Sequence, residues 1–186
     1  MINIRYASIR SMDISNGEGV GIALFVQGCH FHCKNCFNQN TWDFNGGNVW
    51  DEQNENELMN LLNRPYISRI SILGGEPLEK ENIDGVLHII KQIHLKFPEK
   101  KIWLYTGYKW EDIFIEKEKE PIKNSIDFLI MSKRQSAIRQ CNVLIDGVFI
   151  DSLKDISLKW RGSTNQRVID VQESIKKEKI VLWKNS

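Results

Sequence analysis

Short apolar runs alternate with amphipathic segments between residues 21 and 105, and this alternation limits the possible folds more than any other feature. Three of the apolar runs predict buried strands, namely 21–27, 67–73 and 101–105. The segments between them, 51–63 and 81–97, predict helices, and in the second the apolar residues recur at 3.6-residue spacing. Because strands that alternate with helices pack as an α/β fold, we expect a mainly parallel sheet.

The remainder of the chain has weaker patterns. Residues 110–119 predict a further helix, and residues 126–131 and 142–145 predict two further strands. Asp146-Gly147 is typical of a tight turn and predicts a hairpin into residues 148–150. The last forty residues contain only short apolar runs around Arg161-Gly162-Ser163.

The length and charge of the chain exclude several classes of protein. Its 186 residues suit one domain but not a complete (β/α)8 barrel, which needs about 250 residues. Hydrophobic residues make up 41% of the chain, which is enough for a core, and the net charge of +1 argues against nucleic-acid binding. No apolar run approaches the about 18 residues of a membrane span. Because residues 1–10 also lack a secretory signal, we expect a cytoplasmic protein with no membrane segment.

Three of the four cysteines form the pattern C-x3-C-x2-C at Cys29, Cys33 and Cys36. In a reducing compartment such a cluster indicates metal binding rather than disulfides, and thiolates suit zinc or iron–sulfur clusters. Three cysteines can hold three corners of a 4Fe–4S cube and leave the fourth iron open to a cofactor. An electron-carrier ferredoxin would need four. We therefore favour a 4Fe–4S cluster.

A structural zinc site is the alternative interpretation of this loop. It would use the three clustered cysteines with Cys141, His30 or His32 as the fourth ligand. We interpret His30 and His32 as spacers and Cys141 as a buried structural residue.

Most of the chemically interesting residues follow predicted strands. The cysteine segment 29–36 follows the first strand, Gly74-Gly75-Glu76-Pro77 the second and Thr106-Gly107 the third, and Asp146-Gly147 ends a later one. In parallel sheets, ligands bind at the carboxyl ends of the strands. We therefore expect these segments to meet at one rim.

The order of these motifs resembles the radical S-adenosylmethionine (SAM) superfamily, in which C-x3-C-x2-C after the first strand is followed by a GGEP motif. More narrowly, the chain resembles the activating enzymes of anaerobic (class III) ribonucleotide reductases from about residue 5 to residue 175. The segments that carry this resemblance are Gly28-Cys29, Cys36-Phe37-Asn38, Thr41-Trp42, Trp103–Tyr108, Val143–Gly147 and the RGSxNQR signature in 160–167. Residues 125–140 look like an insertion relative to that family.

The resemblance implies a fold and an activity. It implies one radical SAM domain over residues 1–186, built as an incomplete, open (β/α) barrel, with its cluster loop at 28–38 and a C-terminal signature region at 160–167. A reduced 4Fe–4S cluster would cleave SAM to a 5′-deoxyadenosyl radical, which abstracts hydrogen from a glycine of the anaerobic ribonucleoside-triphosphate reductase large subunit. The electron donor would be flavodoxin- or ferredoxin-like.

The resemblance also implies residue roles, with the chemistry carried by the cofactors and no separate catalytic side chain. The residues expected to ligate the cluster are Cys29, Cys33 and Cys36. The residues expected to bind SAM are Asn35, Cys36, Phe37, Gly74, Gly75, Glu76 and Thr106. Among these, Glu76 is expected to contact the methionine ammonium and Thr106 the ribose or carboxylate.

Two other functions stay open on the sequence. The second enzyme interpretation is an activase of another glycyl radical enzyme, such as the formate-lyase type, although those relatives usually lack the signature at 161–167. A non-catalytic zinc-binding interaction module is the alternative outside enzymes.

Overall fold

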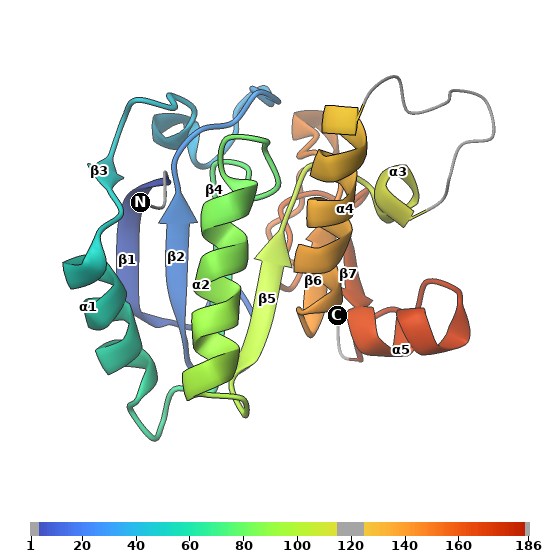
Figure 1. Ribbon diagram of the computed structural model, residues 1–186. Coiled ribbons are helices and arrows are strands. Elements are labelled where there is room, and N and C mark those ends of the chain that lie inside the picture. Colours follow the sequence, from blue (N-terminus) through green and yellow to red (C-terminus); the bar gives the residue numbers. More distant parts are fainter. Residues whose placement is uncertain (1–3, 115–124, 185–186) are drawn as a thin grey trace.

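The computed structural model describes residues 4–114 and 125–184, and within them seven strands form one sheet (Figure 1). The strands are β1 (Arg5–Asp13), β2 (Gly21–Val26), β3 (Asn48–Val49), β4 (Arg69–Gly74), β5 (Lys101–Tyr105), β6 (Val143–Asp146) and β7 (Arg167–Asp170). Their order across the sheet is β3-β1-β2-β4-β5-β6-β7. The four central strands are parallel, whereas β1, β3 and β7 pair antiparallel at the two sides.

Helices connect the parallel strands. They are α1 (Glu52–Leu62), α2 (Ile83–Lys96), α3 (Trp110–Phe114), α4 (Ser125–Arg139) and α5 (Val171–Lys177), with 3-10 turns η1 (Gln39–Thr41) and η2 (Asp151–Leu153). Figure 1 shows α1, α2 and α4 lying across the same face of the sheet. The predicted α/β class and its mainly parallel sheet are confirmed.

The best-predicted elements are those with the strongest local signals. All six residues of β2 are buried, as a continuous apolar run predicts. Helix α1 begins after Asp51, whose side chain accepts a hydrogen bond from the Asn54 amide, and it ends before Pro65. Five apolar residues of α2 are buried, namely Ile83, Val86, Ile89, Ile90 and Ile93, and their spacing places them on one face.

Two strand predictions in the second half are wrong. Residues 126–131 belong to helix α4, because a short apolar run has no periodicity that separates a strand from a helix segment. The predicted hairpin at Asp146-Gly147 does not form, since β6 pairs with β7 and no strand covers 148–150. The strand predicted at 142–145 is confirmed as β6. Helix α3 occupies 110–114 of the predicted 110–119, of which 115–119 lie outside the described residues.

The two faces of the sheet are covered differently. Side chains such as Ile22, Ile70 and Leu104 pack against the helices in the main core. The opposite face carries smaller clusters, one around Trp103 and one around Phe25. Loops and the C-terminal tail, rather than helices, cover this second face, which leaves room for a cavity.

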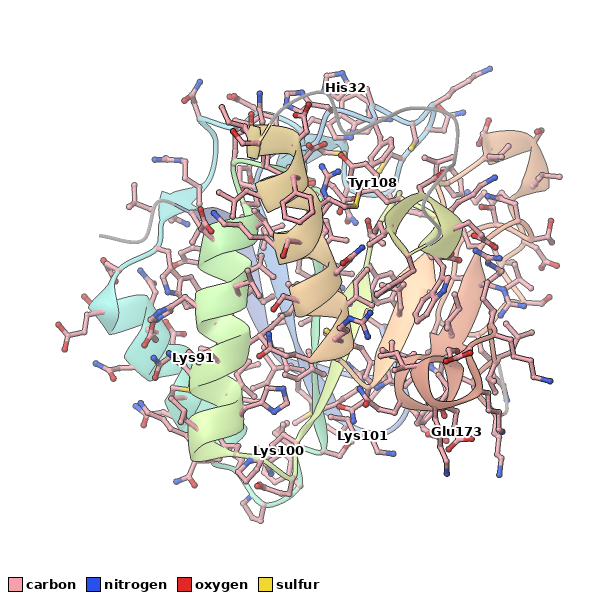
Figure 2. All side chains as sticks on the ribbon, turned by 45° about the vertical axis from the view of Figure 1, so that its right-hand side comes forward. His32, Lys91, Lys100, Lys101, Tyr108 and Glu173 are labelled. Carbon is pink, nitrogen blue, oxygen red and sulfur yellow. The ribbon has the colours of Figure 1, made fainter. Side chains whose placement is uncertain are left out.

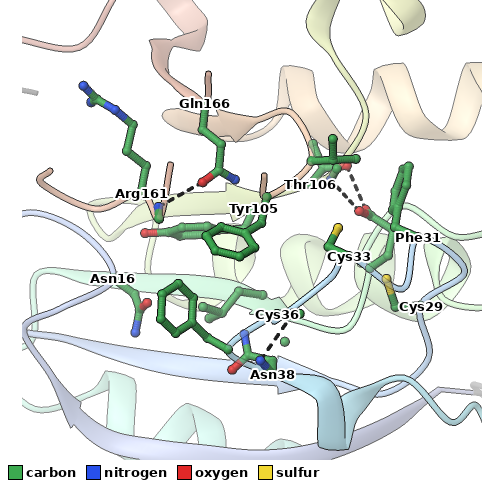
Figure 3. Close-up of a pocket in the computed structure, with 18 of the residues that line it drawn as sticks. Asn16, Cys29, Phe31, Cys33, Cys36, Asn38, Tyr105, Thr106, Arg161 and Gln166 are labelled. Atoms are coloured by element: carbon green, nitrogen blue, oxygen red, sulfur yellow. Dashed lines mark hydrogen bonds between the residues drawn. The ribbon is translucent and has the colours of Figure 1, made fainter. Parts of the chain in front are cut away.

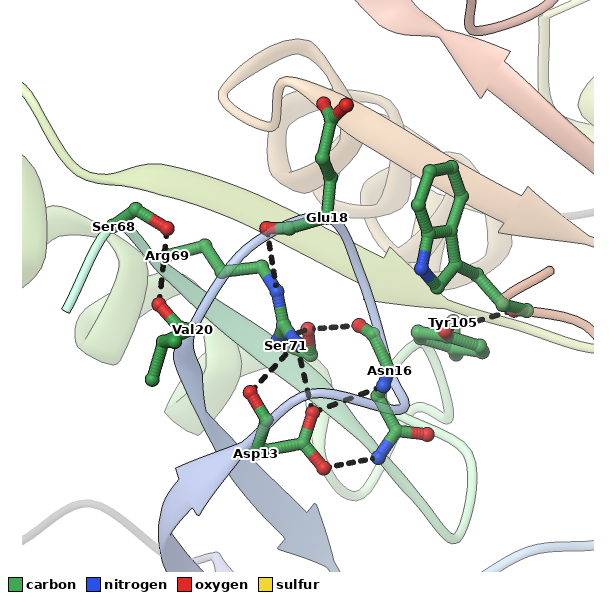
Figure 4. Close-up of polar contacts among 9 residues, drawn as sticks. Asp13, Asn16, Glu18, Val20, Ser68, Arg69, Ser71 and Tyr105 are labelled. Atoms are coloured by element: carbon green, nitrogen blue, oxygen red, sulfur yellow. Dashed lines mark hydrogen bonds and ion pairs between the residues drawn. The ribbon is translucent and has the colours of Figure 1, made fainter. Parts of the chain in front are cut away.

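A buried ion pair holds the loop between β1 and β2 against this second face (Figure 4). Arg69 is fully buried, and its guanidinium donates to the Asp13 carboxylate at 2.9 Å and to the Glu18 carbonyl at 3.1 Å. Asp13 also accepts from the Asn16 amide at 2.9 Å. The pair therefore positions Asn16, which lines the cavity described below.

The two ends of the molecule carry different groups. Figure 2 places His32 and Tyr108 at one end and Lys100 and Lys101 at the other. Because Lys101 begins β5, the parallel strands run from the lysine end toward the cysteine loop. No helix in the described part of the chain is long and apolar enough to cross a membrane.

Candidate functional site

A cavity of about 440 Å³ lies at the carboxyl ends of the four parallel strands (Figure 3). Its walls come from the cysteine loop, the glycine segment after β4, the turn after β5, the loop after β6 and the C-terminal tail. The rim predicted from the strand ends is therefore formed, and segments more than a hundred residues apart meet there.

All three clustered cysteines line the cavity, and each is partly buried. Burial raises the pKa of the Cys29 thiol to about 11 and also raises that of Cys33. The Cys36 sulfur accepts a hydrogen bond from the Asn38 amide at 3.4 Å. Without metal the Cys29 and Cys33 thiols hold their protons at neutral pH, so a metal that binds them must replace those protons.

The donor set fits a multi-iron cluster better than one zinc ion. A single tetrahedral zinc holds its sulfurs about 3.8 Å apart, and the three thiols do not form a set within 4.8 Å of one another. Within the described residues, the side chains whose ligand atoms do lie within 4.8 Å of one another are those of His30, Glu79 and Glu81. In a 4Fe–4S cluster each cysteine binds a different iron, so a wider spacing is suitable.

The candidate fourth ligands of the zinc alternative all have contacts of their own within the protein. Cys141 is fully buried and donates to the Ala137 carbonyl at 3.2 Å, as a structural residue would. The His30 ring lies 3.6 Å from Glu81, and His32 stacks on Trp42 with 4.6 Å between ring centroids.

Backbone contacts join the cysteine loop to the glycine segment. The Gly28 carbonyl accepts from the Glu76 amide at 2.8 Å. A Cβ atom at Gly75 would lie 2.4 Å from that same carbonyl, so only glycine fits. Gly28 has φ +96°, where side chains are disfavoured, and this bend turns the chain from β2 into the cysteine loop. The glycines therefore serve the protein's own packing as well as any ligand.

The Glu76 carboxylate is buried in the cavity wall and is bonded within the protein. It accepts from the Thr106 hydroxyl at 2.8 Å, the Gly107 amide at 2.7 Å and the Leu78 amide at 2.9 Å. Burial raises its pKa to about 7, although these three bonds oppose the rise. Two residues predicted to bind SAM, Glu76 and Thr106, thus bind each other and fix the turn after β5.

Phe37 and Asn35 flank the third cysteine in different ways. Phe37 lines the cavity and packs against Phe149, with 5.2 Å between ring centroids. The Asn35 amide instead donates to the Asp151 carboxylate at 2.8 Å, so its side chain points toward η2. Of the predicted site residues, Cys29, Cys33, Cys36, Phe37, Gly74, Gly75, Glu76 and Thr106 line the cavity, and Asn35 does not.

Side chains of the C-terminal signature hydrogen-bond to the loop after β6 and hold it in place. Gln166 accepts from the Gly162 amide at 2.9 Å and donates to the Gly147 carbonyl at 2.9 Å. Asn165 donates to the Val148 carbonyl at 2.8 Å. This loop contains Phe149, whose backbone opposes the rise in the pKa of the Cys33 thiol.

Arg167, the last residue of the signature, joins three elements. Its guanidinium donates to both carboxylate oxygens of Glu111 in α3, each at 2.7 Å, and to Asp146 of β6 at 3.0 Å. The hydrogen bonds from Arg167 to Glu111 lower the pKa of the Glu111 carboxyl to about 2.

Sequence reasoning missed several cavity residues that come from distant segments. Arg10 lies on β1, and Asn16 and Tyr105 also line the cavity. Neither strand β1, which lies between β3 and β2, nor the loop after it carries a recognisable motif, so nothing in the local sequence marks Arg10 or Asn16.

Fold and site together define an α/β protein in which three clustered cysteines line one cavity at the carboxyl ends of the parallel strands. A family model described as "4Fe-4S single cluster domain" matches residues 15–169. A protein of Salmonella typhimurium (strain LT2) and one of Escherichia coli (strain K12) are each 35% identical over 167 residues, covering 89% of this chain and 97% of the relative. A protein of Enterobacteria phage T4 is 33% identical over 165 residues, which cover 89% of this chain and 93% of the relative.

All three relatives are named anaerobic ribonucleoside-triphosphate reductase-activating protein. This chain belongs to the family of anaerobic ribonucleoside-triphosphate reductase-activating proteins.

Proposed function

We propose that this protein is a radical SAM activase that generates a glycyl radical on an anaerobic ribonucleoside-triphosphate reductase. The observation that carries the proposal is that Cys29, Cys33 and Cys36 share one cavity with Gly74 and Gly75, in a chain whose relatives are named for this activation. When bound, the 4Fe–4S cluster and SAM supply a 5′-deoxyadenosyl radical that removes hydrogen from a glycine of the reductase.

The chain's own residues bind, orient and shield these groups. Cys29, Cys33 and Cys36 would each hold one iron, and the backbone at Gly74 and Gly75 would approach the methionine part of SAM. Aromatic side chains in the lining keep water and other C–H bonds away from a reactive species. They include Phe25, Phe31, Phe37, Tyr105, Phe149 and Trp160.

We extend the proposal to the architecture and setting of the protein. The sheet would be the open, incomplete (β/α) barrel of radical SAM enzymes, formed as one domain by residues 1–186. Its cluster would be reduced by a flavodoxin- or ferredoxin-like donor in the cytoplasm, where thiols stay reduced.

Anaerobic reconstitution tests this function. The wild-type protein with SAM, dithionite and the reductase should yield 5′-deoxyadenosine and a glycyl radical signal in electron paramagnetic resonance. Cys29→Ala should lose both with most of the bound iron, whereas Cys141→Ala, the matched control, should retain them because Cys141 is buried away from the cavity. A Cys29→Ala variant with undiminished radical yield would refute the proposal, as would a colourless wild-type protein containing only zinc.

A further inference from the structure

His30, Glu79 and Glu81, which we call the histidine–glutamate set, gather possible metal ligands outside the cavity of the cysteines. None of the three lines that cavity. One ligand atom from each side chain lies within 4.8 Å of the other two, and His30 Nε2 is 3.6 Å from Glu81 Oε1. Atoms that bind one transition-metal ion at about 2.1 Å lie about 3–4 Å from one another. Small side-chain rotations would therefore let the set share one ion.

The histidine–glutamate set joins two segments that are distant in the sequence. His30 follows Cys29 in the cysteine loop, whereas Glu79 and Glu81 lie just before helix α2. The Glu79 carboxylate accepts from the His30 backbone amide at 3.3 Å, so the two segments are already in contact. The His30 ring packs against Phe44 with 4.5 Å between ring centroids, and this contact helps to hold the ring beside Glu81.

The burial of Glu79 points to a bound cation. Its side chain belongs to a residue that is 5% exposed, and it makes no ion pair within the residues that the structure describes. Its two hydrogen bonds are long, at 3.3 Å from the His30 amide and 3.4 Å from the Tyr108 hydroxyl. Arg134 donates to that hydroxyl rather than to Glu79. Because buried carboxylates are usually paired with a cation or coordinate a metal, an ion here would supply the missing charge.

The contacts that compete with such an ion are weak. Lys80 Nζ lies 3.7 Å from Glu81 Oε1, but the Lys80 side chain is 64% exposed. Exposed ion pairs contribute little to stability, so a metal ion can displace Lys80 from Glu81. Acidic side chains are also favourable near the N-terminus of a helix such as α2, but that effect does not explain the imidazole that faces Glu81.

The donor types indicate which ions suit the histidine–glutamate set. One imidazole and two carboxylates are suited to Zn²⁺, Mn²⁺ or Fe²⁺, whereas Ca²⁺ and Mg²⁺ prefer oxygen ligands alone. The side chains of His30 and Glu81 are partly exposed, so an ion can enter from solvent and water can complete its coordination.

We propose that His30, Glu79 and Glu81 bind a divalent transition-metal ion that links the cysteine loop to the segment before α2. This metal site is separate from the three cysteines, and the inference does not depend on the proposed function. The ion bridges residues that are 49 positions apart, and only the folded protein brings them together. Its binding therefore stabilises the folded state.

Titration with Mn²⁺ tests the site, because Mn²⁺ prefers oxygen and nitrogen ligands to thiolates and so leaves the cysteines free. The protein with its reconstituted, oxidised cluster is titrated anaerobically, and free Mn²⁺ is measured by electron paramagnetic resonance. We expect one bound Mn²⁺ per chain. Glu81→Gln and His30→Ala should each weaken binding by about tenfold or more, since each removes a ligand. Glu57→Gln on the exposed face of α1 is the matched control and should bind as wild type does.

Thermal unfolding provides a second measurement. Mn²⁺ should raise the unfolding temperature of wild type and of Glu57→Gln but not that of Glu81→Gln, whose partly exposed side chain can change without disturbing the fold.

Two results would overturn the inference. One is the absence of Mn²⁺ binding at millimolar concentration. The other is equal binding by wild type, His30→Ala and Glu81→Gln, which would show only a general attraction to surface carboxylates. Neither measurement uses SAM or the reductase, so a protein that binds Mn²⁺ but never produces a glycyl radical contradicts the proposed function alone.

Discussion

Gly75 shows how a single residue can serve the site through packing alone. It lies where the glycine segment after β4 touches the start of the cysteine loop. The sequence suggested that the absence of a side chain there allows SAM to approach, and the structure adds that the Gly28 carbonyl needs the same space. Loop placement therefore requires a glycine at this position, as the proposed binding of SAM would.

We expect Gly75→Ala to displace the cysteine loop, because the new methyl group would lie 2.4 Å from the Gly28 carbonyl oxygen. Overpacking of this kind costs about 1–3 kcal/mol. Denaturant unfolding should show that loss, and iron analysis after reconstitution should show less iron per chain. Stability and iron content equal to wild type would show that the two loops can separate without consequence.

The Asp13–Arg69 pair is the second residue-scale test. Asp13→Ala leaves the fully buried Arg69 guanidinium without its carboxylate, so we expect a loss of about 3–5 kcal/mol in the free energy of unfolding. Glu57→Ala on the exposed face of α1 is the control and should change stability by about 0.5 kcal/mol or less. Equal effects of the two substitutions would mean that the buried pair does not hold the loop.

At the scale of elements, prediction succeeded where burial and periodicity agreed. Strands β2 and β5 and helix α2 are largely buried, and each has an apolar pattern within its own short segment. The sequence alone therefore located them. Helix α4 was mistaken for a strand at 126–131, since its N-terminal half is largely exposed and carries no helical stripe. Strands β1 and β7 were missed because each lies toward a side of the sheet with partly exposed residues.

The junction of α3, β6 and β7 predicts a pH dependence. The hydrogen bonds from Arg167 lower the pKa of Glu111 from its usual 4.5 to about 2. Because the folded-state pKa is depressed, the stabilisation is present above pH 4.5 and is lost as the pH falls through about 2. Glu111→Gln should therefore be less stable than wild type at neutral pH, and urea titrations should show the difference shrinking below pH 4.5. A difference that stays constant down to pH 2 would contradict this assignment.

At the scale of the whole molecule, the fold is built without the metal site. The main core lies between the sheet and its helices, whereas the three cysteines sit in a loop beyond the end of β2. We expect anaerobic iron chelation to leave the far-ultraviolet circular dichroism unchanged while lowering the unfolding temperature, because a ligand bound only by the folded state stabilises it. Loss of the helical signal on chelation would show that the cluster is needed for folding.

The sequence by itself determined the α/β class, the three cysteines, the glycine segment and the family resemblance, because each depends on residue types at short spacing. Only the tertiary structure decided that Asn35 turns toward Asp151 and that Glu76 binds Thr106. Those outcomes depend on contacts between segments up to 116 residues apart. No local pattern encodes such contacts, since they form only once the sheet has brought the strand ends together.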